Sequence, residues 1–221
     1  MIIKISKELR NILPNFGVLA YTMDVKYQDS NIIESAIQEY EKKIKEEYSL
    51  EEILNIPLIK EARDSYKKLG KDPSRYRLAC ESLLRRIVKD NNLYRINNLV
   101  DCGNILSIDL KRSTAVLDLE KIEGNINIRI GKETDEYYGI GRGLLNVSNI
   151  PLYCDNISPF GSPTSDTPRT MVTENTKSIL LMIICFGKYD EQELSTVAID
   201  MFEKYASGQN IRKIEVIESD N

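Results

Sequence analysis

The longest apolar run in the sequence reads Ile179-Leu-Leu-Met-Ile-Ile-Cys-Phe186 and directly follows Ser178. It is far shorter than the roughly 18 residues of a membrane-spanning helix, and its length is that of a β-strand. A continuous apolar run of this length is typical of a strand that is buried in a core. The run therefore predicts a buried strand over Ser178–Phe186.

Segments on either side of this strand have the hydrophobic periodicity of further strands and helices. The expected strands are Phe16–Asp24, Ala115–Ile122, Asn125–Ile130, Ile150–Tyr153 and Ile211–Ile217, with Glu123-Gly124 as the turn between the second and the third. The expected helices cover Lys7–Ile12, a segment that opens at Ser30-Asn31, Pro57–Leu69, a segment that opens at Asp72-Pro73, Asn97–Ser107 and Glu191–Tyr205. These elements predict a single α+β domain over residues 1–218, with a mixed β-sheet core and packed helices, and a frayed tail at 219–221.

The composition restricts the class of protein and its chemistry. Of 221 residues, 42% are hydrophobic and 29% are charged, which fits one compact domain or two small ones. Met1 is followed by neither an apolar signal core nor a cleavage site, so we expect a cytoplasmic protein without membrane contact. The chain has no histidine, which excludes Ser-His-Asp and Cys-His catalysis and any zinc site that uses imidazole. The four cysteines form no C-x-x-C pair, so we expect no bound metal and no cofactor.

Positive charge is concentrated in one segment of an otherwise acidic chain. Residues Lys67–Lys89 contain eight basic and two acidic residues, whereas the whole chain carries a net charge of -4. Such a cluster is typical of a surface that contacts the phosphate backbone of a nucleic acid, although ordinary solvated helix faces have the same composition. The predicted phosphate contacts are Arg75, Arg77, Arg85 and Arg86.

Two polar segments are candidates for a binding or catalytic site. The first, Asn97–Asn104, has three asparagines and Asp101 in an expected helix, where asparagine is a poor helix former. This pattern indicates a polar network that either caps helices or faces a ligand. The second, Phe160–Thr170, is a loop rich in hydroxyl side chains between prolines, in which hydroxyls and backbone N–H groups could bind an oxyanion. Generic polar turns have a similar composition.

Several motifs resemble one known family. Arg95-Ile-Asn-Asn-Leu-Val-Asp-Cys-Gly-Asn-Ile-Leu-Ser-Ile108 and Val172-Thr-Glu-Asn-Thr-Lys-Ser-Ile-Leu-Leu181 resemble two segments of the tRNA-binding and editing domain of the bacterial phenylalanyl-tRNA synthetase beta subunit. This resemblance spans about residues 70–186. Tyr66–Arg77, Glu81–Arg86 and Phe160–Asp166 further resemble free-standing relatives of that domain, over nearly the whole chain.

The resemblance implies a fold like that of the editing domain and a tRNA partner. In the synthetase, this domain hydrolyses tyrosine that is wrongly attached to the phenylalanine tRNA. Asn104 falls on a pocket asparagine of the family, and Gly103 falls where the synthetase usually has threonine. Ala115 stands at the position of a family histidine. Asp166 is the candidate replacement for the family glutamate that binds the tyrosine hydroxyl.

The resemblance also implies a pocket between residues 97–104 and 161–170. We expect Asn104 to hold the amino-acid end or a water, and Asp166 to bind the amine or a phenolic hydroxyl of the ligand. The oxyanion is expected to bind Ser162, Thr164 and Ser165. The other expected substrate contacts are Asn97, Asn98, Asp101, Gly103, Gly161, Arg169 and Thr170. Of these, Arg169 is expected to orient Asp166 or to bind a terminal phosphate. The alternative is a capped helix that faces a rigid polar turn.

Three functions remain open on these residues. The leading hypothesis is trans-editing, in which a free-standing protein hydrolyses a mischarged aminoacyl-tRNA. Without histidine this is still feasible, because the ester is already activated and the terminal ribose hydroxyl of tRNA can assist a positioned water. The alternatives are a non-catalytic binder of tRNA, aminoacyl-tRNA or a free amino acid, and an interaction partner of a synthetase.

Overall fold

The computed structural model describes residues 1–219 of the chain. The strands are β1 (Ile3–Ile5), β2 (Gly17–Asp24), β3 (Thr114–Asp118), β4 (Ile126–Ile130), β5 (Tyr138–Gly139), β6 (Gly143–Leu144), β7 (Pro151–Cys154), β8 (Pro159–Gly161), β9 (Ser178–Cys185), β10 (Gln209–Lys213) and β11 (Val216–Glu218). The α-helices are α1 (Lys7–Ile12), α2 (Glu34–Glu47), α3 (Pro57–Lys68), α4 (Ala79–Val88), α5 (Asn98–Leu110) and α6 (Glu191–Ala206). The predicted α+β class is confirmed.

Strand β9 lies inside a four-stranded sheet of order β10-β2-β9-β3, and it is antiparallel to both of its neighbours. Its alternate side chains enter two different hydrophobic clusters. Leu181 and Ile183 pack toward the helices, whereas Leu180 and Met182 pack toward a second sheet. A strand that is covered on both faces needs apolar residues at every position, which explains the uninterrupted apolar run.

The second sheet has the order β11-β1-β4-β7-β8 and is mixed. Strand β1 runs parallel to β11 and β4, whereas β7 runs antiparallel to β4 and β8. Ile128, Leu152 and Phe160 of this sheet are fully buried in the cluster that also contains Leu180 and Met182 of β9. The two sheets are therefore packed against each other, and their shared core holds β3 in place beside the candidate site.

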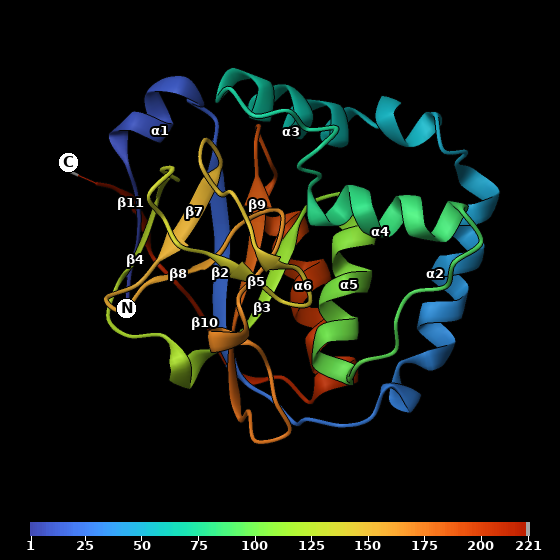
Figure 1. Ribbon diagram of the computed structural model, residues 1–221. Coiled ribbons are helices and arrows are strands. Elements are labelled where there is room, and N and C mark those ends of the chain that lie inside the picture. The colour runs from blue at the N-terminus through green and yellow to red at the C-terminus, as the bar shows by residue number, and fades with distance from the viewer. Residues whose placement is uncertain (220–221) are drawn as a thin grey trace.

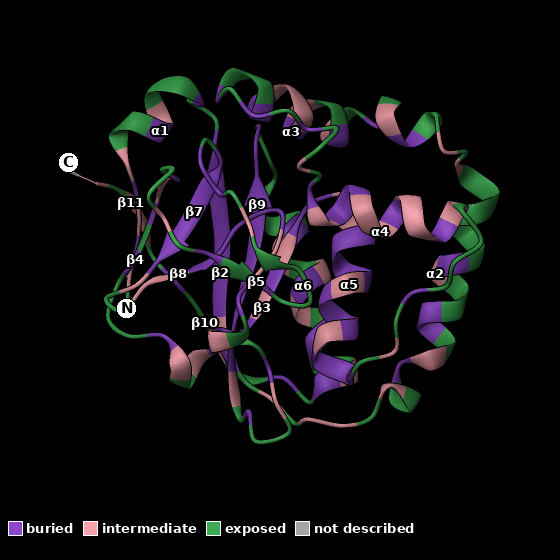
Figure 2. Ribbon diagram, in the orientation of Figure 1, coloured by how far each residue is buried: buried purple, intermediate pink, exposed green. Residues whose placement is uncertain are grey.

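Helices α5 and α6 lie on the other face of the four-stranded sheet, and α2 and α4 pack against the outer side of α5 (Figure 1). Helix α5 is the most deeply buried of them, because it packs against α6, α4 and α2 as well as β3. Figure 2 shows this gradient, with α5 largely buried and the outward faces of α2 and α3 exposed. Within residues 1–219, no helix is both long enough and apolar enough to cross a lipid bilayer.

The predicted helix start at Asp72-Pro73 is wrong. Helix α4 begins at Ala79, and the Asp72 carboxylate instead accepts a hydrogen bond from the Ser74 N–H (2.8 Å) in a turn. The Arg63 side chain holds this turn by donating to the Pro73 carbonyl (3.2 Å). Aspartate followed by proline is compatible with both a turn and a helix start, so the two residues did not distinguish them.

The expected pairing of residues 115–122 with 125–130 is also wrong. Strand β3 belongs to the four-stranded sheet and β4 to the five-stranded sheet, with a 3-10 turn over Leu119–Lys121 between them. The expected closing strand is likewise divided into β10 and β11, one in each sheet. The frayed tail was predicted to include Ser219, but its N–H donates to the Ile5 carbonyl (2.8 Å), and residues 220–221 lie outside the described residues. Local periodicity indicates a strand but not the sheet to which it belongs.

Candidate functional site

A cavity of about 210 Å³ lies between α5, β3 and the loop that follows β8. The polar side chains in its wall are those of Asn104, Thr114 and Asp166, and the remainder is apolar apart from a glycine. Its wall consists of Ile96, Val100, Gly103, Asn104, Thr114, Val116, Leu117, Ile140, Asp166, Met171 and Val172. The structure thus brings the segments 97–104 and 161–170 together at one cavity.

Gly103 sets the distance between α5 and β3. A Cβ atom on this residue would lie 2.5 Å from Cγ2 of Val116, which is closer than real Cβ contacts allow. The Thr114 hydroxyl also donates to the Gly103 carbonyl (2.8 Å), which ties the helix to the strand. A helix in contact with a strand through a glycine places the next residue, Asn104, at the edge of the sheet and in the wall of the cavity.

Asn104 and Asp166 are the polar groups of the cavity that remain available to a ligand. Across residues 1–219, neither side chain donates or accepts a hydrogen bond, and Oδ1 of Asp166 is out of contact with solvent. Burial raises the pKa of Asp166 to about 7. An unpaired buried carboxyl oxygen is costly for folding alone, and the Asn104 amide lies half-exposed in the same wall, so the two positions are consistent with a binding role.

The hydroxyl groups of the loop form bonds within the loop instead. The Ser162 hydroxyl donates to the Ser165 carbonyl (2.9 Å) and accepts from the N–H groups of Thr164 (3.3 Å) and Ser165 (3.1 Å). The Thr164 hydroxyl is paired with that of Tyr66 (2.9 Å), and Tyr137 donates to the Ser165 carbonyl. The hydroxyl donors of this turn are therefore bonded within the protein, and the expected oxyanion role of Ser162, Thr164 and Ser165 stays a prediction.

Two further residues of the loop shape the site without facing it. Gly161 leaves room for Asp166, since a Cβ at this position would lie 2.9 Å from Oδ1 of that carboxyl. Thr170 is fully buried, with a hydroxyl that has no partner in the described part of the chain.

Among the described residues, Arg169 makes no hydrogen bond to Asp166, and the expected contact of its guanidinium with a terminal phosphate stays a prediction. Its guanidinium donates to the carboxylate of Asp155 (2.8 Å) and to the carbonyls of Lys121 (2.8 Å) and Ser158 (3.2 Å). These bonds join the loop to the five-stranded sheet. Arginine is typical of such multiple contacts because its planar guanidinium has five donors.

The other polar residues at the start of α5 stabilise the fold rather than line the cavity. Asn97 is the N-cap of the helix and accepts from the Val100 N–H (3.0 Å). Asn98 is fully buried and binds the backbone of Gln28, and the Asp101 carboxylate accepts from the Ile96 N–H. The capping alternative describes the hydrogen bonds of these three residues, and their expected substrate contacts stay predictions.

Ala115 also lies outside the cavity. Its side chain is buried in the core between the two sheets, while the adjacent residues Thr114 and Val116 face the cavity. Successive residues of a strand point to opposite faces, so a side chain at position 115 cannot reach a ligand bound beside Asn104. The comparison of Ala115 with the family histidine therefore does not identify a cavity position.

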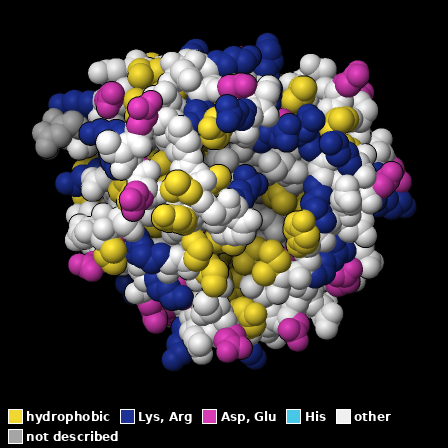
Figure 3. All heavy atoms as spheres, viewed as in Figure 1, with side chains coloured by type: hydrophobic (Ala, Val, Ile, Leu, Met, Phe, Trp, Pro, Cys, Tyr) yellow, Lys and Arg dark blue, Asp and Glu magenta, His cyan; other side chains and the backbone are white. Residues whose placement is uncertain are grey.

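The apolar wall of the cavity was not predicted. Ile96, Ile140 and Met171 are 54%, 45% and 40% exposed, which is unusual for large apolar side chains. Figure 3 shows hydrophobic side chains gathered at the centre of this face, with Lys and Arg side chains above and to the right of them. In sequence these residues do not differ from core residues, because only the fold shows that they face an opening.

The basic cluster is divided between structural and surface positions. Glu81 is buried and lies near three guanidinium groups, those of Arg63 (2.8 Å), Arg85 (3.9 Å) and Arg77 (4.0 Å). The Arg85 side chain is only 19% exposed, which favours its pairing with Glu81, and its expected phosphate contact stays a prediction. Arg75 and Arg77 remain exposed. Arg86 lies over the ring of Tyr94.

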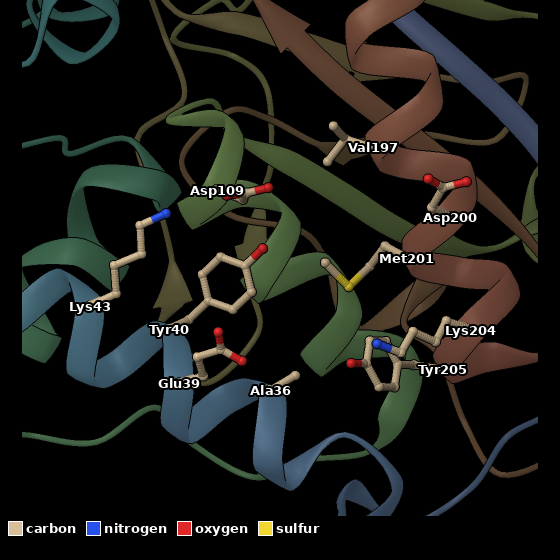
Figure 4. A pocket seen from close by; sticks show the side chains of 10 residues that line it. All are labelled: Ala36, Glu39, Tyr40, Lys43, Asp109, Val197, Asp200, Met201, Lys204 and Tyr205. Carbon is tan, nitrogen blue, oxygen red and sulfur yellow. The ribbon is translucent and has the colours of Figure 1, made fainter.

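A second cavity, of about 390 Å³, lies between α2, α5 and α6 (Figure 4). Its carboxylates, on Glu39, Asp109 and Asp200, are accompanied by the amines of Lys43 and Lys204. Burial and the charge of Asp109 raise the pKa of Tyr40 to about 12. Opposite charges are mixed throughout this cavity, whereas the cavity beside Asn104 combines an apolar wall with two unpaired polar groups.

The fold is that of a known class of domain. The whole chain superposes on the crystal structure of an N-terminal fragment of the phenylalanyl-tRNA synthetase beta-subunit from Pyrococcus horikoshii, with a TM-score of 0.54 and 12% identity. The match covers 52% of that fragment. A 52-residue segment is 38% identical to the phenylalanine–tRNA ligase beta subunit of Bartonella henselae, which is 24% of this chain and 6% of that protein.

The fold therefore defines an α+β domain of the kind found in this beta subunit. The family model of the B3/4 domain matches residues 61–214, which is more than half of the chain. The chain belongs to the B3/4 domain family, and the predicted resemblance is confirmed.

Proposed function

We propose that the protein binds the acceptor end of a mischarged tRNA and hydrolyses its aminoacyl ester in the cavity beside Asn104 and Asp166. The observation that carries this proposal is the pair of unpaired polar side chains in an otherwise apolar cavity. The similar proteins are subunits of a tRNA ligase, which supports tRNA as the partner. The exposed arginines Arg75 and Arg77 supply positive charge for its phosphates.

The groups of the cavity suit ester hydrolysis. Water adds to the carbonyl carbon, the bond to the ribose oxygen breaks, and the products are a free amino acid and a tRNA with a restored hydroxyl. The Asn104 amide can both donate and accept, so it can hold the attacking water or stabilise the carbonyl oxygen. The Asp166 carboxylate binds the ammonium group of the amino acid, and a hydroxyl of the terminal ribose assists the water.

Deacylation of a panel of mischarged tRNAs tests this proposal. Replacing the amide in Asn104→Ala should lower the rate by ~10² to 10³, the usual cost of losing one oxyanion donor. Asp166→Ala should raise KM, because it removes the partner of the ammonium group. Two matched controls, Asn127→Ala on β4 and Asp200→Ala in the second cavity, should retain the wild-type rate. Equal rates in all five folded proteins would exclude this site.

Binding without hydrolysis is the second candidate function. The observation that favours it is the internal pairing of the Ser162, Thr164 and Ser165 donors, which leaves Asn104 as the free amide donor of the cavity. In that case the wild type would bind aminoacyl-tRNA, lose affinity in Asn104→Ala and deacylate no member of the panel.

A further inference from the structure

Tyr94 is a large aromatic side chain held in a fixed position on the surface. It is 63% exposed, although it lies in the segment between α4 and α5 that leads into the buried helix. The Arg86 guanidinium lies 3.7 Å from the centre of its ring and donates to its hydroxyl (2.9 Å). Arg86 also donates to the Asn92 carbonyl (2.7 Å), so the guanidinium is fixed at both ends.

This arrangement covers one face of the ring and leaves most of the side chain open. Among the described residues, the one ring or cation contact of Tyr94 is that with Arg86. An exposed aromatic ring ordinarily loses rotamer freedom when a ligand binds, but here the protein has already fixed it. A rigid ring with an open face and a cation beneath it favours a flat, electron-rich partner.

The ring is also close to the candidate site. Ile96 lines the cavity of Asn104, and two residues of chain separate its Cα atom from that of Tyr94 by at most ~7 Å. Ile96 is 54% exposed and Tyr94 is 63% exposed, so two large, open side chains stand next to Arg95 at the edge of the cavity. Exposed basic residues flank helix α4 at both ends, with Arg77 before the helix and Lys89 after it.

We infer that Tyr94 and Arg86 form a stacking platform for the unpaired base at the 3′ end of an RNA. The base stacks on the open face of Tyr94, and its ribose then lies beside Ile96, with the attached acyl group directed to the cavity. This inference rests on the proposed function and extends it to the recognition of the terminal nucleotide. RNA suits this surface better than a protein partner because the cation of the platform, Arg86, belongs to the basic segment Lys67–Lys89.

Fluorescence of 2-aminopurine tests the platform. The probe is a short RNA duplex with an unpaired 2-aminopurine at its 3′ end. Its fluorescence should be quenched when it binds the full-length wild type. It should also bind more tightly than the same duplex with a blunt end. Tyr94→Ala should abolish the quenching and raise the Kd of the overhang RNA by roughly 5- to 100-fold. Tyr94→Phe keeps the ring and should retain both properties, as should Tyr189→Ala, which removes a tyrosine that contacts Gly17.

The outcomes separate the platform from the proposed chemistry. Unchanged quenching and overhang preference in a folded Tyr94→Ala protein would overturn the platform, even if Asn104→Ala abolishes deacylation. Tyr94-dependent quenching without any effect of Asn104→Ala on deacylation would support the platform and overturn the proposed chemistry. A wild type that binds neither RNA, or that self-associates through Tyr94, would overturn the platform in favour of protein docking. Tyr94→Leu, which keeps apolar bulk without a flat ring, should behave like Tyr94→Ala.

Discussion

Gly103 is the residue on which the shape of the cavity depends most directly. It allows α5 to touch β3, and it places the Asn104 amide in the wall instead of the core. Asp166 reaches the same wall from the opposite side because Gly161 gives it room. Two glycines and two polar residues, from segments far apart in the chain, therefore define the site.

Gly103→Ala should destabilise the protein. The added methyl group would meet Val116, and overpacking of this kind costs ~1 to 3 kcal/mol, of which the better helix propensity of alanine offsets up to ~1 kcal/mol. The free energy of unfolding, measured in urea, should fall by ~1 to 2 kcal/mol. In a protein that already carries Val116→Ala, the added methyl group has room, so Gly103→Ala should lower the free energy of unfolding by less than it does in the wild type. Strictly additive losses would contradict the close contact.

Asp166 should make stability depend on pH. The pKa of Asp166 is about 7 in the folded protein, whereas an unfolded chain has the ordinary value of about 3.9. Between these values the folded state binds the proton more tightly than the unfolded chain does. The contribution of Asp166 to the free energy of unfolding is therefore fully present below about pH 4 and is lost as the pH rises to about 7. Asp166→Asn should therefore gain stability relative to wild type between pH 4 and pH 8. Parallel stability profiles of the two proteins would disprove the raised pKa.

Among the elements, β9 holds the two sheets and the helices together. Leu181 is fully buried on the helix side of this strand. Leu181→Ala should cost ~2 to 5 kcal/mol in the free energy of unfolding, because it leaves a cavity in a packed core. Leu144→Ala on β6, where the side chain is 67% exposed, should cost less than ~0.5 kcal/mol. A similar small loss at both positions would contradict the burial of β9.

Helix α4 and the turn before it contain arginines with different expected roles, in tRNA binding and in stability. Substitution of one arginine of each kind should distinguish the two roles. Arg75→Gln removes an exposed charge, so it should weaken tRNA binding and lower the salt dependence of log K by about 1. Arg85→Gln removes a largely buried partner of Glu81 and should lower the thermal stability while leaving the salt dependence unchanged. Titrations at several salt concentrations measure both effects. A lower salt dependence for Arg85→Gln would show that this residue contacts phosphate after all.

At the scale of the whole molecule, most of the longer elements could be predicted from local sequence, whereas short strands such as β1 and β8 and the assembly of the sheets could not. The apolar run of β9 and the amphipathic pattern of α6 are local features, and both elements were predicted within two residues of their ends. The assignment of β3 and β4 to different sheets depends on tertiary packing, which no local pattern contains.

The candidate site divides in the same way. The proximity of Asn104 and Asp166 was predicted through the family resemblance, and the structure brings both residues to one cavity. The roles of Ser162 and Arg169 were not predictable, because composition does not show whether a hydroxyl or a guanidinium is already bonded to its neighbours. Polar residues that satisfy one another have the same sequence signature as polar residues that await a ligand.

A crystal structure with a non-hydrolysable aminoacyl-adenosine analogue tests the central claim, the location of the site, most directly. The account predicts that the aminoacyl group occupies the cavity between α5 and the loop after β8. The Asn104 amide and the Asp166 carboxylate should then lie within hydrogen-bonding distance, ~2.7 to 3.2 Å, of polar atoms of the analogue. An analogue bound in the second cavity, between α2 and α6, with Asn104 and Asp166 still unpaired, would contradict it.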